Sequence, residues 1–213
     1  MARKRSDEKR DRILEAAIEI FAREGFFGSR ISDVAKKAGV ADGTIYLYFK
    51  NKDHLLTSLF DELMAEHVER GREKIRNLPD APSRLRAIAR YHLDLLGSDR
   101  DLAIVFQVEL RQSTKFMERF TASWFGTYLD VITEIVATGQ SEGSVRTDVS
   151  PKLLAKAFFG ALDEMVTSWI LAKRRDSLPK LAEPIVSIFL DGAAPRDQPA
   201  ALPSTPLGVM ETA

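Results

Sequence analysis

Apolar residues recur through most of this chain at the three- and four-residue spacing that places them on one face of a helix. In the segment DRILEAAIEIFAREG the apolar face consists of Ile13, Ala16, Ala17, Ile20 and Phe21. Gly25 follows where a helix C-terminus favours a left-handed residue, so we expect a first helix over about residues 9–25.

The same period predicts two short helices between residues 29 and 48 and a longer helix that begins near Lys52. Ser29 and Ser32 are candidate N-caps of the first short helix, and Asp42 is the candidate cap of the second. The later helices are expected at about 83–97, 101–111, 115–140, 151–174 and 179–191, between Gly, Ser and Pro breaks. Because no segment alternates with the period of a strand, the pattern predicts an all-α chain.

The stretch from Ile45 to Phe49 is unusual because five bulky residues stand together directly before Lys50 and Lys52. A helix turns by about 100° per residue, so these side chains cannot all face a core. We expect Ile45, Leu47 and Phe49 to point inward, and Tyr46 and Tyr48 to point outward beside the lysines.

Charge is distributed unevenly, although the chain as a whole has a formal net charge of zero. Residues 1–52 carry 12 Lys and Arg against 8 Asp and Glu, whereas the remaining residues carry 19 against 23. A basic N-terminal segment on an acidic body favours a polyanion as partner of that segment.

The two short helices meet at Ala38-Gly39-Val40, and a glycine turn between short helices is typical of a helix-turn-helix. In that motif the second helix enters the major groove of double-stranded DNA. The candidate base-edge contacts are Asp42, Gly43 and Thr44, and the candidate phosphate contacts are Tyr46, Tyr48, Lys50 and Lys52.

Three elements, ILEAAIEIFAREG, SRISDVAKKAGV and GTIYLYFKNKDHLL, together resemble the DNA-binding domain of the TetR family of repressors. The resemblance implies phosphate contacts from Ser29 and Arg30, and Ala41 stands where the family often has serine. It also implies a homodimer on a palindromic operator. The domains expected are a helix-turn-helix domain over 1–52, a helical ligand-binding and dimerisation domain over 53–192, and a disordered tail over 193–213.

Two late segments are apolar over a face wider than a surface helix needs, which favours a four-helix interface between two subunits. The candidate interface residues are Leu154, Ala161, Leu181, Ile185, Ile188 and Phe189. The alternative is that these residues close the subunit's own core.

The middle of the chain is rich in aromatic residues beside the charged pair Glu109 and Arg111, a composition suited to an amphiphile with an anionic head. The candidate ligand-binding residues are Phe106, Glu109, Leu110, Arg111, Phe120, Trp124, Phe125, Tyr128, Phe158, Leu162, Met165 and Trp169. Periodicity alone does not distinguish a cavity from a filled core, so both interpretations stand at this point.

The segments LAIVFQVELRQS and GALDEMVTSWI resemble the acyl-CoA-responsive fatty-acid-degradation repressors of the TetR family. That resemblance implies long-chain acyl-CoA as the effector and a repressor of fatty-acid metabolism genes. Arg111, Arg90 and Arg100 are candidates for the head-group site. The alternative is a TetR-like repressor of a multidrug efflux pump, induced by an aromatic or cationic drug that a cavity carboxylate from Glu109, Asp163 or Glu164 would receive.

Other classes of protein find little support in the residues. The three histidines lie on different predicted helices without metal-ligand spacing, and no nucleophile or phosphate-loop motif occurs, so we expect neither an enzyme nor a bound cofactor or metal. There is no cysteine, no apolar run near the roughly 20 residues of a membrane span, and no apolar segment behind the N-terminal MARKRSDEKRDR. We therefore expect a cytoplasmic protein without a membrane partner.

Overall fold

The computed structural model describes residues 2–114, 116–118, 124–172 and 177–192, and side chains from residue 8 onward, Trp124 excepted. Its elements are α1 (Ala2–Glu24), α2 (Ile31–Ala38), α3 (Asp42–Tyr48), α4 (Lys52–Ile75), α5 (Ala81–Ser98), α6 (Arg100–Ile104), the π-helical η1 (Val105–Glu109), the 3₁₀ turn η2 (Leu110–Gln112), α8 (Trp124–Ser141), α9 (Pro151–Leu171), the 3₁₀ turn η3 (Leu178–Leu181) and α10 (Ala182–Asp191). Within these ranges there is no strand, so the predicted all-α class is confirmed. The predicted tail over 193–213 lies outside the described residues.

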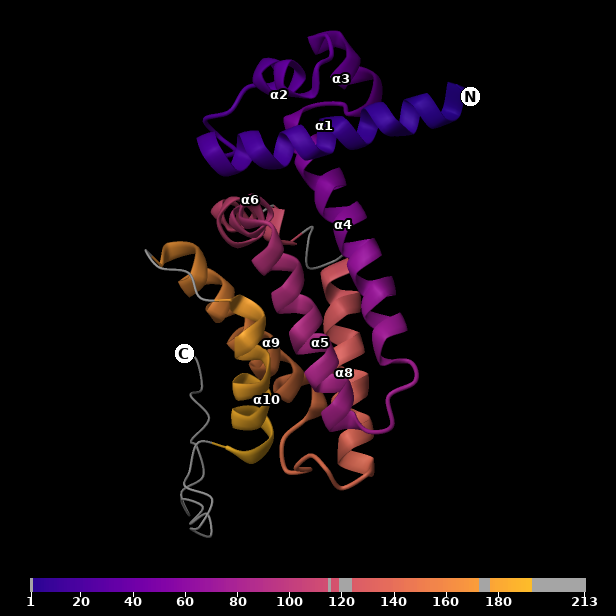
Figure 1. The fold of residues 1–213 in the computed structure, drawn as a ribbon, viewed down its shortest axis with the longest axis vertical. Helices are drawn as coiled ribbons and strands as arrows, with labels where there is room; N and C mark the ends of the chain where they lie inside the picture. The colour runs from indigo at the N-terminus through magenta and orange to yellow at the C-terminus, as the bar shows by residue number, and fades with distance from the viewer. Residues whose placement is uncertain (1, 115, 119–123, 173–176, 193–213) are drawn as a thin grey trace, which may run out of the picture.

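Helices α1–α3 form one end of the molecule, which we call the N-terminal unit (Figure 1). Phe21, Phe26, Ile45 and Phe49 fill its centre and are at most 2% exposed. Gly39 adopts the left-handed conformation, φ 68°, that ends α2, and the following Val40 N–H donates to the Ala35 carbonyl at 3.0 Å. The glycine turn predicted between the two short helices is therefore present.

The predicted N-caps of these two helices are wrong. The cap positions are Arg30 for α2 and Ala41 for α3, and neither side chain makes a capping hydrogen bond. Ser29 instead donates its hydroxyl to the Phe26 carbonyl at 2.9 Å, and Asp42 is already the first residue of α3.

Helix α4 leaves the N-terminal unit and packs with α5 and α8, and α9 and α10 complete what we call the C-terminal bundle (Figure 1). Gly139 of α8 allows a close approach at the far end of this bundle: a Cβ at that position would lie 2.8 Å from the Ala81 Cβ and 2.6 Å from the Val145 Cγ2. None of the described helices is long and apolar enough to cross a bilayer.

Helix α1 begins at Ala2 rather than near residue 9, and two later predicted helices differ in type from the observed ones. The helix expected at 101–111 is divided into α6, η1 and η2, and its central turn is π-helical. Such single π-turns occur often at functional sites. The helix expected at 179–191 begins as the 3₁₀ turn η3, because Pro184 has no N–H to donate one turn back and so interrupts the α-helical ladder there.

Candidate DNA interface and ligand pocket

Helix α3 presents a continuous exposed surface at the outer end of the N-terminal unit. Asp42 and Gly43 are exposed, Thr44 is half-buried, and Tyr46 is 56% exposed. A Cβ at Gly43 would meet no atom of the chain within 4 Å. The fold therefore places no demand on this glycine, and the space beside it is open to a partner.

The inward position predicted for Leu47 is wrong, since its side chain is 82% exposed. Ile45 and Phe49 are buried as expected, and Tyr48 packs partly against the core. Alternate positions 45, 47 and 49 share a face only in a strand, whereas a helix places residues three and four apart together. Leu47 thus joins Tyr46 on the outer surface.

Two predicted phosphate contacts are directed into the protein. Ser29 is buried, at 4% exposed. The Lys52 Nζ donates to the Phe26 carbonyl at 2.6 Å and to the Ser29 carbonyl at 2.8 Å, and it lies 4.7 Å from the centre of the Phe26 ring. Partial burial lowers the pKa of Lys52. We therefore leave Ser29 and Lys52 out of the candidate DNA interface.

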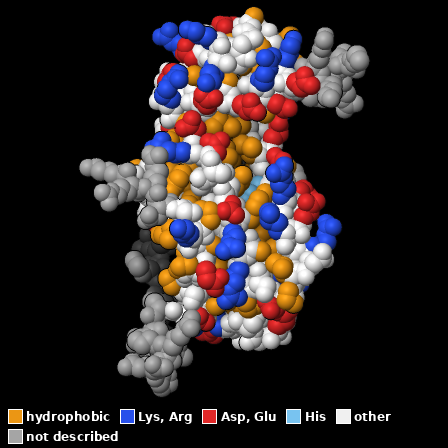
Figure 2. Space-filling view, viewed as in Figure 1, with side chains coloured by type: hydrophobic (Ala, Val, Ile, Leu, Met, Phe, Trp, Pro, Cys, Tyr) orange, Lys and Arg blue, Asp and Glu red, His pale blue; other side chains and the backbone are white. Residues whose placement is uncertain are grey.

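The other two basic candidates, Arg30 and Lys50, are exposed. Lysine and arginine side chains gather around the N-terminal unit, and a band of Asp and Glu side chains lies below them (Figure 2). The arrangement suits a polyanion approaching this end of the molecule, because positive charge near the phosphates and acidic charge farther away favour one orientation.

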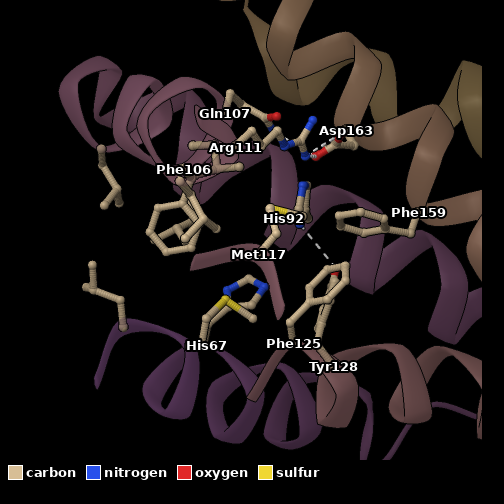
Figure 3. Close-up of a pocket in the computed structure, with 16 residues that line it drawn as sticks. His67, His92, Phe106, Gln107, Arg111, Met117, Phe125, Tyr128, Phe159 and Asp163 are labelled. Atoms are coloured by element: carbon tan, nitrogen blue, oxygen red, sulfur yellow. Dashed lines mark hydrogen bonds and ion pairs between the residues drawn. The ribbon is translucent and has the colours of Figure 1, made fainter. Parts of the chain in front are cut away.

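The C-terminal bundle contains an apolar pocket with about 670 Å³ of empty space, the open volume at its mouth included. Sites for small molecules commonly combine apolar walls with a few polar groups. The apolar lining comprises Leu63, Met64, Leu95, Leu96, Leu102, Phe106, Leu110, Met117, Phe125 and Phe159. The polar lining comprises His67, His92, Gln107, Arg111, Tyr128 and Asp163, gathered from several elements (Figure 3).

The sequence predicted some of the residues that line this pocket. The predicted ligand residues that line the pocket are Phe106, Leu110, Arg111, Phe125 and Tyr128. Those described residues that do not line it are Glu109, Phe158, Leu162, Met165 and Trp169. Phe158 and Leu162 are fully buried, and Phe158 packs on Phe189 of α10 with ring centroids 4.9 Å apart. Phe120 and the Trp124 side chain lie outside the described part of the chain.

The contribution of α4 and α5 to the pocket was missed from the sequence. His67 and His92 each occupy a position on the apolar face of a long helix, and a histidine at such a position was the available signal. Both are buried, and burial lowers the pKa of His67 to about 3 and that of His92 to about 4, so both rings are neutral at pH 7.

Arg111 stands at the exposed end of the pocket, paired with Asp163 (Figure 3). Its Nη2 donates to both carboxylate oxygens, at 2.7 and 2.8 Å, and Gln107 donates to the same carboxylate at 2.8 Å. Arg90 and Arg100 do not line the pocket, and Arg100 donates instead to the Ile170 carbonyl at 3.3 Å. Among the described residues that line the pocket, Arg111 is therefore the only one with an Arg or Lys side chain.

Glu109 faces away from the pocket and joins the two halves of the chain. The carboxylate, 4% exposed, accepts a hydrogen bond from the Phe26 N–H at 2.5 Å, although 83 positions separate the two residues. The Phe26 ring also packs edge-on against Phe116, with centroids 5.2 Å apart. Pocket residues Phe106 and Arg111 flank Glu109 in the same short segment, so this segment contacts both the pocket and the N-terminal unit.

No cluster of three or more metal-ligating side chains occurs among the residues described.

Comparisons with known proteins match two successive parts of the chain to two family models. The family described as "Bacterial regulatory proteins, tetR family" matches residues 13–59, and "YsiA-like protein, C-terminal region" matches residues 60–192. The chain is 37% identical over 180 residues to the fatty acid metabolism regulator protein of Bacillus subtilis, covering 84% of this chain and 93% of that protein.

Two solved structures share the fold over nearly the same length. FadR from Bacillus subtilis in complex with stearoyl-CoA is 36% identical with a TM-score of 0.82, covering 86% of this chain and 98% of that one. FadR from Bacillus halodurans, a fatty acid degradation regulator, is 35% identical with a TM-score of 0.84, covering 87% of this chain and 96% of that one.

Proposed function

Because this chain belongs to the tetR family of bacterial regulatory proteins, we propose that it is a DNA-binding repressor of fatty-acid metabolism genes that long-chain acyl-CoA releases from its operator. The observation that carries this proposal is the apolar pocket with one guanidinium at its mouth, in a chain 37% identical to a fatty acid metabolism regulator. The protein acts in the cytoplasm by binding, without catalysis.

The acyl chain occupies the apolar pocket and supplies most of the binding energy. Each methylene group removed from water contributes about 0.8 kcal/mol. The CoA portion remains at the mouth, where Arg111 is the side chain that can receive a phosphate or the thioester oxygen. Asp163 is the lining carboxylate, and its pairing with Arg111 leaves it unsuited to hold a cationic drug. The 37% identity to a fatty acid metabolism regulator favours acyl-CoA over the efflux-pump alternative.

Operator binding uses the exposed surface of α3 and its surroundings. Asp42, Gly43 and Thr44 meet base edges, and Tyr46 and Lys50 contact phosphates, with Arg30 and Tyr48 beside them. A backbone close to the groove explains why Gly43 is glycine although the fold leaves room for a side chain. Leu47, exposed beside Tyr46, supplies an apolar contact suited to a thymine methyl.

Two copies bind a palindromic operator together. Several apolar or small residues of α9 and α10 are exposed, among them Leu153, Ala161, Leu171 and Ile188. The other predicted interface residues lie nearer the chain's own core, since Ile185 is buried and Leu154, Leu181 and Phe189 pack against it. We propose that the exposed set forms the dimer contact, which sets two recognition helices about 34 Å apart.

Ligand entry is transmitted through η1 and η2. When the ligand's anionic groups compete with Asp163 for Arg111, the segment that carries Arg111 shifts, and Glu109 in that segment moves with it. Its hydrogen bond to Phe26 then positions the N-terminal unit differently. An effector can change operator affinity only through such a difference between the two states.

The test combines operator release with a set of matched effectors. A duplex selected from a random library by the purified protein is labelled, and its release is followed by fluorescence anisotropy on adding stearoyl-CoA, CoA, stearate, or a quaternary ammonium compound with the same alkyl chain. We expect release by stearoyl-CoA alone. Release by the ammonium compound instead would favour the efflux-pump alternative. Failure to select any duplex would refute the proposed function as a DNA-binding repressor.

A further inference from the structure

Two imidazole nitrogen atoms inside the pocket have no hydrogen-bond partner among the described residues: Nδ1 of His67 and Nε2 of His92. The two side chains are 5% and 7% exposed, so solvent does not reach them freely. Buried polar atoms in native proteins are nearly always paired, and each exception calls for an explanation. These two atoms belong to a wall that is otherwise largely apolar.

The hydrogen bond between Tyr128 and His92 defines what the second nitrogen atom offers. The Tyr128 hydroxyl lies 3.2 Å from His92 Nδ1, and burial raises the pKa of Tyr128, so the hydroxyl keeps its proton. Nδ1 of His92 is the acceptor that the described residues provide for that proton. In the tautomer in which Nδ1 accepts that proton, the neutral His92 ring carries its own proton on Nε2, which is then a donor. A hydrocarbon chain cannot accept that hydrogen bond, whereas an oxygen atom can.

His67 lies in the same part of the pocket, with its ring 6.0 Å from that of His92 and 5.1 Å from that of Tyr128. Its other face stacks on Tyr91 at 4.6 Å, which holds the ring in place. Figure 3 shows Arg111 and Asp163 at one end, His92 next to them, and His67 and Tyr128 farther from Arg111. A ligand that enters past Arg111 thus meets the two histidines within its acyl portion.

We propose that His67 and His92 form a polar subsite that binds an oxygen atom of the ligand's acyl portion and so determines which acyl-CoA acts as effector. The inference rests on the proposed acyl-CoA function. Two sources supply this oxygen chemistry: the thioester carbonyl itself, or a hydroxyl or oxo group on the chain. A saturated chain lying over both histidines with its carbonyl elsewhere would leave two buried polar atoms unpaired.

The experiment compares three ligands of equal chain length by calorimetry on the intact protein. Palmitoyl-CoA has the carbonyl alone, 3-hydroxypalmitoyl-CoA adds a hydroxyl, and hexadecyl-CoA, a thioether, lacks the carbonyl. The variants are His67→Phe, which keeps a ring stacked on Tyr91, and the double variant His92→Phe with Tyr128→Phe, which removes both partners of one hydrogen bond together. Tyr91→Phe serves as control, because Tyr91 does not line the pocket.

In the wild type we expect an oxygen-bearing ligand to bind about fivefold more tightly than the matched ligand without that oxygen, since a net hydrogen bond contributes about that much. A palmitoyl-CoA advantage over hexadecyl-CoA identifies the carbonyl, and an advantage of 3-hydroxypalmitoyl-CoA over palmitoyl-CoA identifies the chain substituent. Either advantage should disappear in at least one histidine variant and persist in the control.

Equal affinities for all three ligands in the wild type would overturn the subsite, and so would an advantage that survives in both histidine variants. Binding of none of the three would instead refute the proposed acyl-CoA function, and the subsite with it. A thermal melt and operator binding without ligand show that each variant is folded, and the two independent variants guard against one failing to fold.

Discussion

Replacing Glu109 with leucine should weaken operator binding even when no effector is present. The Glu109 carboxylate accepts a hydrogen bond from the Phe26 N–H at 2.5 Å. Both residues are buried, with Glu109 4% exposed and Phe26 2% exposed. A hydrogen bond to a charged group contributes about 1.5–3 kcal/mol, and its removal leaves the Phe26 N–H without that acceptor in a buried place. The bond joins the pocket segment to the N-terminal unit, so its loss acts on their relative position.

If that free energy holds the operator-binding arrangement, its loss shifts the equilibrium toward the released state by roughly tenfold to hundredfold. Each apparent affinity follows the population of the state that binds that partner, so operator binding should weaken and acyl-CoA binding should tighten, and the two factors multiplied together should equal that shift. The two affinities are measured separately, by anisotropy of a labelled operator and by calorimetry with palmitoyl-CoA.

Glu142→Leu is the matched control for this prediction. The Glu142 carboxylate also accepts a backbone N–H, that of Ala81 at 3.3 Å, but both residues lie within the C-terminal bundle. We expect it to leave the operator affinity unchanged. If Glu109→Leu bound operator and acyl-CoA as the wild type does, or if both variants weakened operator binding equally, the coupling role of Glu109 would be refuted.

Three further predictions concern α3, α8 and the buried histidines. Gly43→Ala should raise the free energy of unfolding by up to about 1 kcal/mol while weakening operator binding, because the fold leaves room for the methyl group; unchanged operator affinity would contradict the proposed approach. Gly139→Ala should lower the free energy of unfolding in urea, since overpacking against Val145 costs about 1–3 kcal/mol and outweighs the helix propensity gained; equal or greater stability would contradict this. His67 and His92 have pKa values depressed from 6.5, so their contribution is complete above pH 6.5 and is lost as pH falls toward about 4, by about 1.4 kcal/mol per pH unit for each ring. His67→Phe should remove one ring's share of that slope, and an identical slope would refute the assignment.

The sequence predicted the helices and the motif because both depend on local spacing, and it failed where a contact joins distant segments. The sequence predicts Ser29 and Lys52 as surface groups, since nothing in the neighbouring residues indicates that Lys52 reaches back to the carbonyl groups of Phe26 and Ser29. Leu47 was misplaced by a strand-like alternation within a helix. The predicted pocket lining was incomplete for a similar reason. The lining histidine of α4, His67, lies on a helix face whose apolar pattern is also typical of an ordinary core.

The backbone N–H and carbonyl of Phe26, which belong to two successive peptide groups, are where these distant contacts converge. Its N–H donates to Glu109 of η1, and its carbonyl accepts from Ser29 and from Lys52, the first residue of α4. Hydrogen bonds are directional and weaken steeply as their angle departs from the optimum. A displacement of Glu109 must therefore either break its bond or move the backbone at Phe26, whose carbonyl is bonded to Lys52 at the start of α4 and to Ser29 in the loop that precedes α2. The segment beside the pocket and the N-terminal unit are joined through directional bonds at one loop, which no local pattern in the sequence reveals.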